Sequence, residues 1–107
     1  EILKDYADQL TYSGRAAQAV PLYRELLSGE RRPEEIRAVE RGLALALARS
    51  GRAEEAVAAW ERIVAAAPGD ADARSNLREA LIASARDLAS RDQNARSATL
   101  FARAIEL

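Results

Sequence analysis

The chain has 107 residues, enough for one domain that buries roughly 65% of the surface exposed by its unfolded form. Apolar residues make up 49% and charged residues 31%, which is typical of a helical protein rich in Ala, Leu, Glu and Arg rather than of a β-sandwich or a disordered segment. The net charge of -1 supplies no overall field that would attract nucleic acid or an anionic membrane, and the absence of cysteine excludes disulfides, zinc-thiolate sites and thiol catalysis.

Apolar residues recur with the period of an α-helix through the first half of the chain and predict three helices. The first begins at residue 2, and Gly14 is placed to end it in a left-handed conformation. The second spans 16–28 and is followed by a loop at 29–32. Pro33, followed by Glu34 and Glu35, favours a helix start, since proline suits the first helical position and acids stabilise the positive end of the helix dipole. We therefore expect a third helix that reaches residue 50.

Three further helices are predicted in the second half of the chain. Gly51 closes the third helix, and the fourth continues from residue 53 until Pro68 and Gly69 break the pattern. Asp70 is suited to be the N-cap of a fifth helix that continues to about residue 90, and Asp92 is suited to cap the sixth, whose amphipathic pattern continues to residue 107. The chain is therefore predicted to be all-α, with six helices in three antiparallel pairs.

A four-residue phrase, Ser-Gly-Arg-Ala, occupies 13–16 and recurs at 50–53, 37 residues later. In both copies a small residue and then an aromatic residue follow, Tyr23 in the first and Trp60 in the second. Phe101 takes the corresponding place in the sixth helix. A repeat of this length indicates a helical solenoid, in which each helix pair buries one face against its neighbours and a long concave surface stays available. Such a surface favours binding over chemistry.

The second copy of the repeat, at about 33–68, has large, small, large, glycine, small, aromatic and proline residues in the order Leu43, Ala44, Leu47, Gly51, Ala56, Trp60 and Pro68. The first copy, at about 1–32, has Tyr6, Ala7, Leu10, Gly14, Ala19, Tyr23 and Leu27 at its corresponding positions. This pattern resembles that of the tetratricopeptide repeat (TPR) family over essentially the whole chain. The resemblance implies a right-handed TPR-type solenoid of three helix pairs, forming a single domain.

The third repeat, at about 69–107, departs from the pattern. It begins with Leu77 and Leu81, but Arg78 occupies a small-residue position. The step from Leu77 to Phe101 is also seven residues longer than its counterpart in the second repeat. We expect these two extra helical turns to be shared between the fifth and sixth helices, so that both helices keep their inward faces.

The TPR resemblance implies that the first helix of each pair lines a concave groove that holds a peptide or a partner's helix. The positions that it implies are Lys4, Asp8, Thr11, Tyr12, Arg41, Leu45, Ala48, Arg49, Ser75, Asn76, Glu79 and Ile82. TPR domains that grip a C-terminal carboxylate carry a particular set of Lys, Asn and Arg, of which only Lys4 and Asn76 are present, and this argues against such a clamp. Apolar Leu45, Ala48 and Ile82 among charged neighbours favour a ligand with both apolar anchors and charges.

Two features of the sequence have more than one interpretation. Tyr12 is either a binding hot spot or a partly exposed ring that packs on the next helix pair. A group of arginines would suit an acidic ligand or a phosphate: Arg31, Arg32, Arg37, Arg41 and Arg52. Glutamates alternate with them, however, which is more typical of a solvated face with weak i, i+4 pairs. We therefore expect no nucleic-acid partner.

Most residue types and motifs needed for catalysis are missing. The chain has no His, no Cys, no phosphate-binding glycine loop and no G-x-S-x-G sequence. The carboxylate pairs at 34–35 and 54–55 fall at predicted helix starts, where acids stabilise the dipole without doing chemistry. We therefore predict no enzymatic activity, no cofactor and no metal. The longest apolar run, 43–48, is far shorter than the roughly 20 residues of a membrane span, so no direct membrane insertion is expected.

Two functions within the binding class remain open. The first is an adaptor whose groove binds a protein or peptide. The second is a scaffold segment of a longer bacterial TPR array, because residues 19–27 and the irregular repeat lengths are similar to the arrays that precede outer-membrane barrels in exopolysaccharide export. Apolar patterns without caps at both ends predict self-association and indicate a piece of a longer protein. The Ala- and Arg-rich composition indicates a bacterial source, with the cytoplasm and the periplasm both open as compartments.

Replacement of the predicted aromatic wedge tests the repeat alignment. We expect Trp60→Ala to lower the free energy of unfolding by roughly 3 to 5 kcal/mol, because a large side chain would be removed from between two repeats. Chemical or thermal unfolding measures the loss. An unchanged melting temperature would contradict the alignment.

Overall fold

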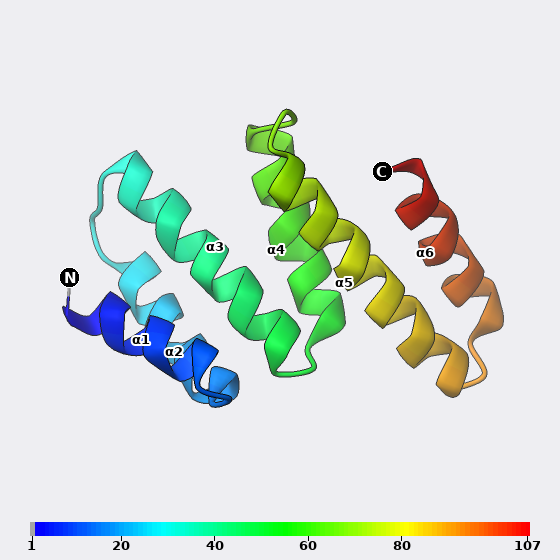
Figure 1. Ribbon diagram of the computed structural model, residues 1–107, viewed down its shortest axis with the longest axis horizontal. Coiled ribbons are helices and arrows are strands. Elements are labelled where there is room, and N and C mark those ends of the chain that lie inside the picture. Colours follow the sequence, from blue (N-terminus) through cyan, green and yellow to red (C-terminus); the bar gives the residue numbers. More distant parts are fainter. Residues whose placement is uncertain (1) are drawn as a thin grey trace.

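The computed structural model describes residues 2–107 as six helices joined by short connections (Figure 1). The helices are α1 (Ile2–Tyr12), α2 (Ala16–Ser28), α3 (Pro33–Arg49), α4 (Ala53–Ala66), α5 (Ala71–Ser90) and α6 (Asn94–Glu106). Residues 2–107 contain no strand, so the all-α prediction is confirmed. Each helix packs against the next one along the chain, and successive helices run in opposite directions. The resulting row measures 43 × 29 × 21 Å.

Two glycine turns end the first helix of each of the first two pairs in the same way. Gly14 and Gly51 adopt φ values of 86° and 81°, in the left-handed region where a Cβ atom is unfavourable. The next residue in each turn donates its backbone N–H back to the helix, from Arg15 to Leu10 O at 2.8 Å and, in the second turn, from Arg52 to Leu47 O at 2.9 Å. These bonds satisfy carbonyl groups that the helix end leaves without partners. The predicted left-handed glycine at position 14 is confirmed.

The third such turn uses aspartate in place of glycine. Asp92 adopts φ 59°, and the next residue, Gln93, donates its N–H to Leu88 O at 2.9 Å, the same bond as in the two glycine turns. Aspartate tolerates the left-handed region better than most residues with a side chain. The prediction that Asp92 caps the sixth helix is therefore wrong, because this residue closes α5 and Gln93 occupies the N-cap position of α6.

Matching the three turns corrects the register of the third repeat. The matched positions in the first helix of each pair are Ala7, Ala44 and Ala85, and all three are fully buried. Arg78 therefore does not occupy the small-residue position. The aromatic residue follows the turn residue by nine positions in each pair, so α6 is not lengthened and the extra residues lie at the beginning of α5. The expectation that two helices share the added length is wrong.

Two predicted helix starts are confirmed. Pro33 is the first residue of α3, where its missing N–H costs no intrahelical bond. Asp70 caps α5, since its Oδ1 accepts a hydrogen bond from the backbone N–H of Ala73 at 3.0 Å. Local chemistry therefore sets where these two helices begin.

One aromatic side chain fills the space between each helix pair and the next. Tyr23 on α2 is fully buried and lies directly against Gly42 on α3, and Trp60 on α4 is only 1% exposed. Phe101 on α6 is 37% exposed, because no helix within residues 2–107 follows α6. The exposed end of the row therefore carries an aromatic residue at the position that is buried in the other two pairs.

The contact between Tyr23 and α3 predicts the effect of adding one methyl group. A Cβ atom at position 42 would lie 2.6 Å from Cε1 of the Tyr23 ring. Alanine is the better helix former by about 1 kcal/mol, but overpacking a core costs about 1–3 kcal/mol. Because the ring is fully buried and cannot easily move aside, we expect Gly42→Ala to lower the free energy of unfolding by up to about 2 kcal/mol, measured by urea denaturation.

Gly69→Ala is the matched control, because a Cβ atom there would meet no atom within 4 Å. Its stability should be unchanged or slightly higher, since alanine restricts the unfolded chain more than glycine does. Stabilisation by Gly42→Ala would show that Tyr23 moves aside and that the contact is loose.

Candidate functional site

A hollow opens between α3 and α5. The first helices of the first two pairs, α1 and α3, are in direct contact, whereas α3 and α5 share no comparable contact. Ala56 and Trp60 on α4 line the bottom of the gap but are themselves almost fully buried, and the volume of the hollow is about 370 Å³. The full lining is Leu45, Ala48, Arg49, Ala53, Ala56, Trp60, Asn76, Glu79, Ala80 and Ala83. Five of the predicted groove residues therefore meet in one place: Leu45, Ala48, Arg49, Asn76 and Glu79.

The lining combines apolar side chains with opposite charges. Leu45 and the alanines offer a surface for an apolar side chain, while Arg49 on α3 and Glu79 on α5 contribute a positive and a negative group. Neither Arg49 nor Glu79 forms an ion pair with another of residues 2–107. Asn76 adds an amide that both donates and accepts hydrogen bonds. The hollow can therefore bind a side chain and hydrogen-bond the backbone next to it.

Tyr12 reaches this hollow through Arg49. The Arg49 guanidinium lies 5.0 Å from the centre of the Tyr12 ring, within the range of a cation-π contact. Tyr12 itself is 62% exposed, and it also lines a shallow surface with Tyr6 and Gln9 of α1. This geometry links α1 to the hollow and restrains the Arg49 side chain.

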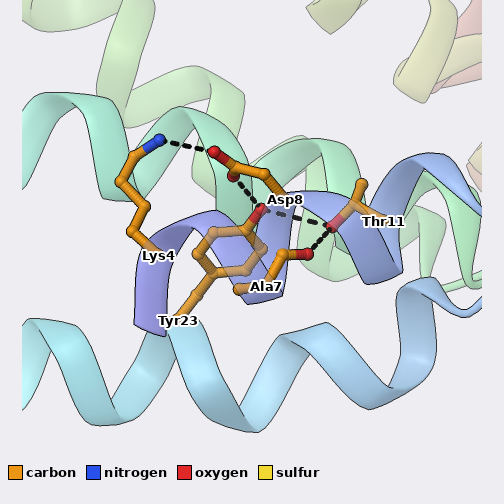
Figure 2. Close-up of polar contacts among 5 residues, drawn as sticks. All are labelled: Lys4, Ala7, Asp8, Thr11 and Tyr23. Carbon is orange, nitrogen blue, oxygen red and sulfur yellow. Dashed lines mark hydrogen bonds and ion pairs between the residues drawn. The ribbon is translucent and has the colours of Figure 1, made fainter. Parts of the chain in front are cut away.

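The other predicted groove residues on α1 are occupied by contacts within the protein (Figure 2). Lys4 Nζ lies 2.8 Å from Asp8 Oδ2, and the Tyr23 hydroxyl donates a hydrogen bond of 2.5 Å to Asp8 Oδ1. Thr11 is buried; its Oγ1 donates to Ala7 O at 2.9 Å and lies 3.2 Å from the Tyr23 hydroxyl oxygen. Asp8 and Thr11 therefore hold α1 against α2, Lys4 pairs with Asp8 within α1, and none of the three lines the hollow.

The same contacts suppress ionisation of Tyr23. Burial is the main cause that raises the pKa of this phenol far above its ordinary value of 10.0, and the hydrogen bond to Asp8 raises it further. The neutral hydroxyl can donate to the carboxylate, whereas a phenolate would repel it. Tyr23 thus remains a hydrogen-bond donor over the whole physiological pH range.

Arg41 also has a structural partner. Its Nη1 donates to Asp70 Oδ2 at 2.6 Å, and its guanidinium lies 5.8 Å from the centre of the Trp60 ring. The backbone N–H of Ala73 and then the Arg41 side chain hold the pKa of Asp70 below its usual value. Arg41 therefore ties the beginning of α5 to α3, away from the hollow between α3 and α5. Ile82, the last predicted groove residue, lines a separate hollow between α5 and α6.

The arginines of the 29–32 loop are paired with a neighbouring glutamate. Arg32 Nε lies 2.9 Å from Glu35 Oε1, and Arg31 Nη1 lies 3.8 Å from Glu35 Oε2. Arg31 Nε also donates to Leu26 O at 2.6 Å. These contacts favour the interpretation of a solvated, mutually neutralising surface over that of a basic binding strip.

The sequence interpretation missed the three lining residues on α4, Ala53, Ala56 and Trp60, because it took the groove from the first helix of each pair alone. On α5 it missed Ala80 and Ala83. The alignment of the third repeat caused the two omissions on α5, because it shifted this helix by seven residues relative to the first two repeats. Matching Asp92 to Gly14 and Gly51 would have placed Ala83 at the position of Gly42. The signal was hidden because the third turn carries an aspartate where the first two carry glycine.

Residues 2–107 contain no group of three or more His, Cys, Asp or Glu side chains that could together hold a metal ion. None of the helices in this part of the chain combines the length and apolar character required to span a bilayer. No protein-family model matches the sequence, and comparison with curated proteins finds no relative. The function must therefore be inferred from the chain's own side chains.

Removal of one hydroxyl tests the contact between α1 and α2. We expect Tyr23→Phe to lower the free energy of unfolding by about 1 to 3 kcal/mol at neutral pH, because Asp8 loses a buried donor. Folded Tyr23 keeps its proton above pH 10, whereas the unfolded chain releases it. The contribution is therefore present in full below about pH 10 and is lost as the pH rises further. Urea denaturation at neutral and alkaline pH should show the difference between the variants shrinking.

Tyr12→Phe removes the same hydroxyl from an exposed ring and serves as the control. Its stability should stay within about 0.5 kcal/mol of the original. Equal effects of the two variants would contradict the structural role of the Tyr23 hydroxyl.

Proposed function

We propose that the chain is a non-catalytic protein-protein interaction module that binds a peptide or a partner's helix in a concave groove. The hollow between α3 and α5 carries the proposal, because it gathers Leu45, Arg49, Asn76 and Glu79 over an indole floor. An apolar cavity with a few polar groups at its margin is the usual form of a binding site. No arrangement of a nucleophile with a base is present among its lining residues.

A TPR-type solenoid is the architecture that we propose for this module. Three helix pairs, three equivalent turns and an aromatic residue at the same distance after each turn support it. In such a solenoid the first helices of the pairs form the concave side, and the gap between α3 and α5 lies on that side. The bacterial origin suggested by the composition is part of the same proposal.

The chemistry of the hollow indicates what a ligand must supply. One apolar side chain would enter between Leu45 and Ala83 and lie above Trp60. A carboxylate beside that side chain would pair with Arg49, and a basic or amide group would meet Glu79 on the other wall. A short segment with an apolar anchor and both kinds of charge fits these requirements.

A second function is favoured by the exposed apolar side chains at both ends of the row. Ile2 is 88% exposed on α1, and Ile105 is 84% exposed on α6. Large apolar patches on a soluble surface are commonly interaction sites. The chain would then be a scaffold segment of a longer bacterial TPR array, such as those in exopolysaccharide export, or would self-associate through its ends.

Filling the hollow tests the groove. Ala48 is exposed and lies on the lining, so Ala48→Trp would place an indole inside the cavity without disturbing the core. We expect peptides selected from a displayed library on the original protein to bind the variant at least about tenfold more weakly. Fluorescence anisotropy with labelled peptides measures the change.

Ala58→Trp adds the same ring to an exposed position on α4 that does not line the hollow. It should leave the affinity unchanged, and circular dichroism should show both variants folded. Peptides that bind the Ala48→Trp variant as well as the original would place the working surface elsewhere and contradict the proposal.

A further inference from the structure

A second hollow lies at the α6 end of the row, between α5 and α6. It encloses about 350 Å³ and is lined by Arg78, Ile82, Arg86, Phe101, Ala104 and Ile105. None of these residues lines the hollow between α3 and α5. Phe101 and Ile105 expose 37% and 84% of their surfaces, so the apolar part of this hollow faces solvent.

The two other aromatic positions show what this surface is shaped to receive. Tyr23 lies against Gly42 of α3, and Trp60 is buried on α4, which packs against α5, where Ala80 and Ala83 line the same hollow as the indole. In both cases the next α-helix along the chain contributes small residues beside the aromatic side chain. Phe101 occupies the same position after its turn, and its hollow therefore has the form of a helix-binding site.

The charged side chains that line this hollow are both positive. Arg78 and Arg86 lie two helical turns apart on α5, on either side of Ile82, and are separated by about 12 Å along the helix axis. Neither forms an ion pair with another of residues 2–107, whereas the α6 arginines Arg96 and Arg103 pair with glutamates of α4. A helix that covers Phe101 would therefore meet two positive charges without carboxylate partners.

A pairing between an arginine and the carboxylate of a neighbouring helix is already present between α3 and α5. Arg41 on α3 binds Asp70, the residue that caps α5, and α5 is the helix that packs against α4, which carries Trp60. An arginine on α3 thus binds a carboxylate at the beginning of α5, the helix that follows the aromatic residue.

We propose that the α5–α6 hollow docks an acidic amphipathic helix of a partner protein. Small and apolar residues of that helix would cover Phe101, Ile82 and Ile105. Two carboxylates, seven or eight residues apart, would reach Arg78 and Arg86, because this spacing spans about 10 to 12 Å. This site is separate from the groove proposed above, and the two can be occupied at once.

A second copy of the chain is a poorer fit. Two of these surfaces placed face to face would bring the arginines of one copy against those of the other. Docking of α1 would offer only Asp5 as an available carboxylate, because Asp8 is already bound by Lys4 and Tyr23. One carboxylate cannot neutralise Arg78 and Arg86 together.

The test uses a stapled, fluorescein-labelled helical peptide with alanine and leucine on one face and two glutamates seven residues apart on its edge. Anisotropy should report binding that weakens as salt is added, since exposed charges are screened. A matched peptide with lysines in place of the glutamates should bind at least about tenfold more weakly. Equal binding of the two peptides, or no binding of the first, would overturn the proposal.

Protein variants locate the site. Arg78→Glu combined with Arg86→Glu should abolish binding of the glutamate peptide and create binding of the lysine peptide. Ile105→Ser should weaken binding without unfolding the protein, because this side chain is 84% exposed. Arg37→Glu changes an exposed arginine on α3 that lies outside this hollow and should have no effect.

Two measurements separate this site from the other candidates. Ala48→Trp should leave the affinity for the glutamate peptide unchanged, and a loss there would assign the peptide to the α3–α5 groove instead. Sedimentation at increasing concentration reports self-association, and a dimer abolished by Arg78→Glu with Arg86→Glu would make a second copy the occupant and overturn the assignment to a partner protein.

Discussion

The packing of one aromatic side chain against small residues of the next helix is the contact on which the rest of the structure depends. A helix pair of this kind cannot bury its apolar face alone, and Tyr23 and Trp60 provide the bulk that fills the space between pairs. The helix that packs on the aromatic ring needs small residues at the contact. Gly42 lies opposite Tyr23 for this reason, and Ala83 lines the same hollow as Trp60. Each contact sets the position of the following helix.

The two aromatic contacts differ, and the difference bears on the binding surface. Gly42 lets α3 come against the Tyr23 ring, and α3 then also touches α1. At the next junction a larger indole meets residues that carry a Cβ atom, and α5 makes no comparable contact with α3. A core residue therefore has a second role, because Trp60 both separates two helix pairs and forms the floor of the hollow between them.

Charges divide into those that hold the protein together and those that remain for a ligand. Lys4 and Asp8 neutralise each other while Asp8 holds the Tyr23 hydroxyl, and Arg41 is bound to Asp70. Arg49 and Glu79 in one hollow, and Arg78 and Arg86 in the other, form no ion pair with any of residues 2–107. Each of these charged side chains lies beside an apolar cavity, and its charge is available to pair with a ligand.

Local chemistry in the sequence was sufficient to predict six helices and most of their ends, since apolar periodicity, glycine turns, Pro33 and the Asp70 cap act over a few residues. The sequence also identified Leu45, Arg49, Asn76 and Glu79, although the register used for α5 was wrong. Only the tertiary structure decided that register, because Asp92 takes a backbone conformation that an aspartate in a sequence does not reveal. It also decided that Asp8 accepts from Tyr23 and that Arg41 binds Asp70, because these contacts depend on the distance between helices and no spacing along the chain encodes that distance.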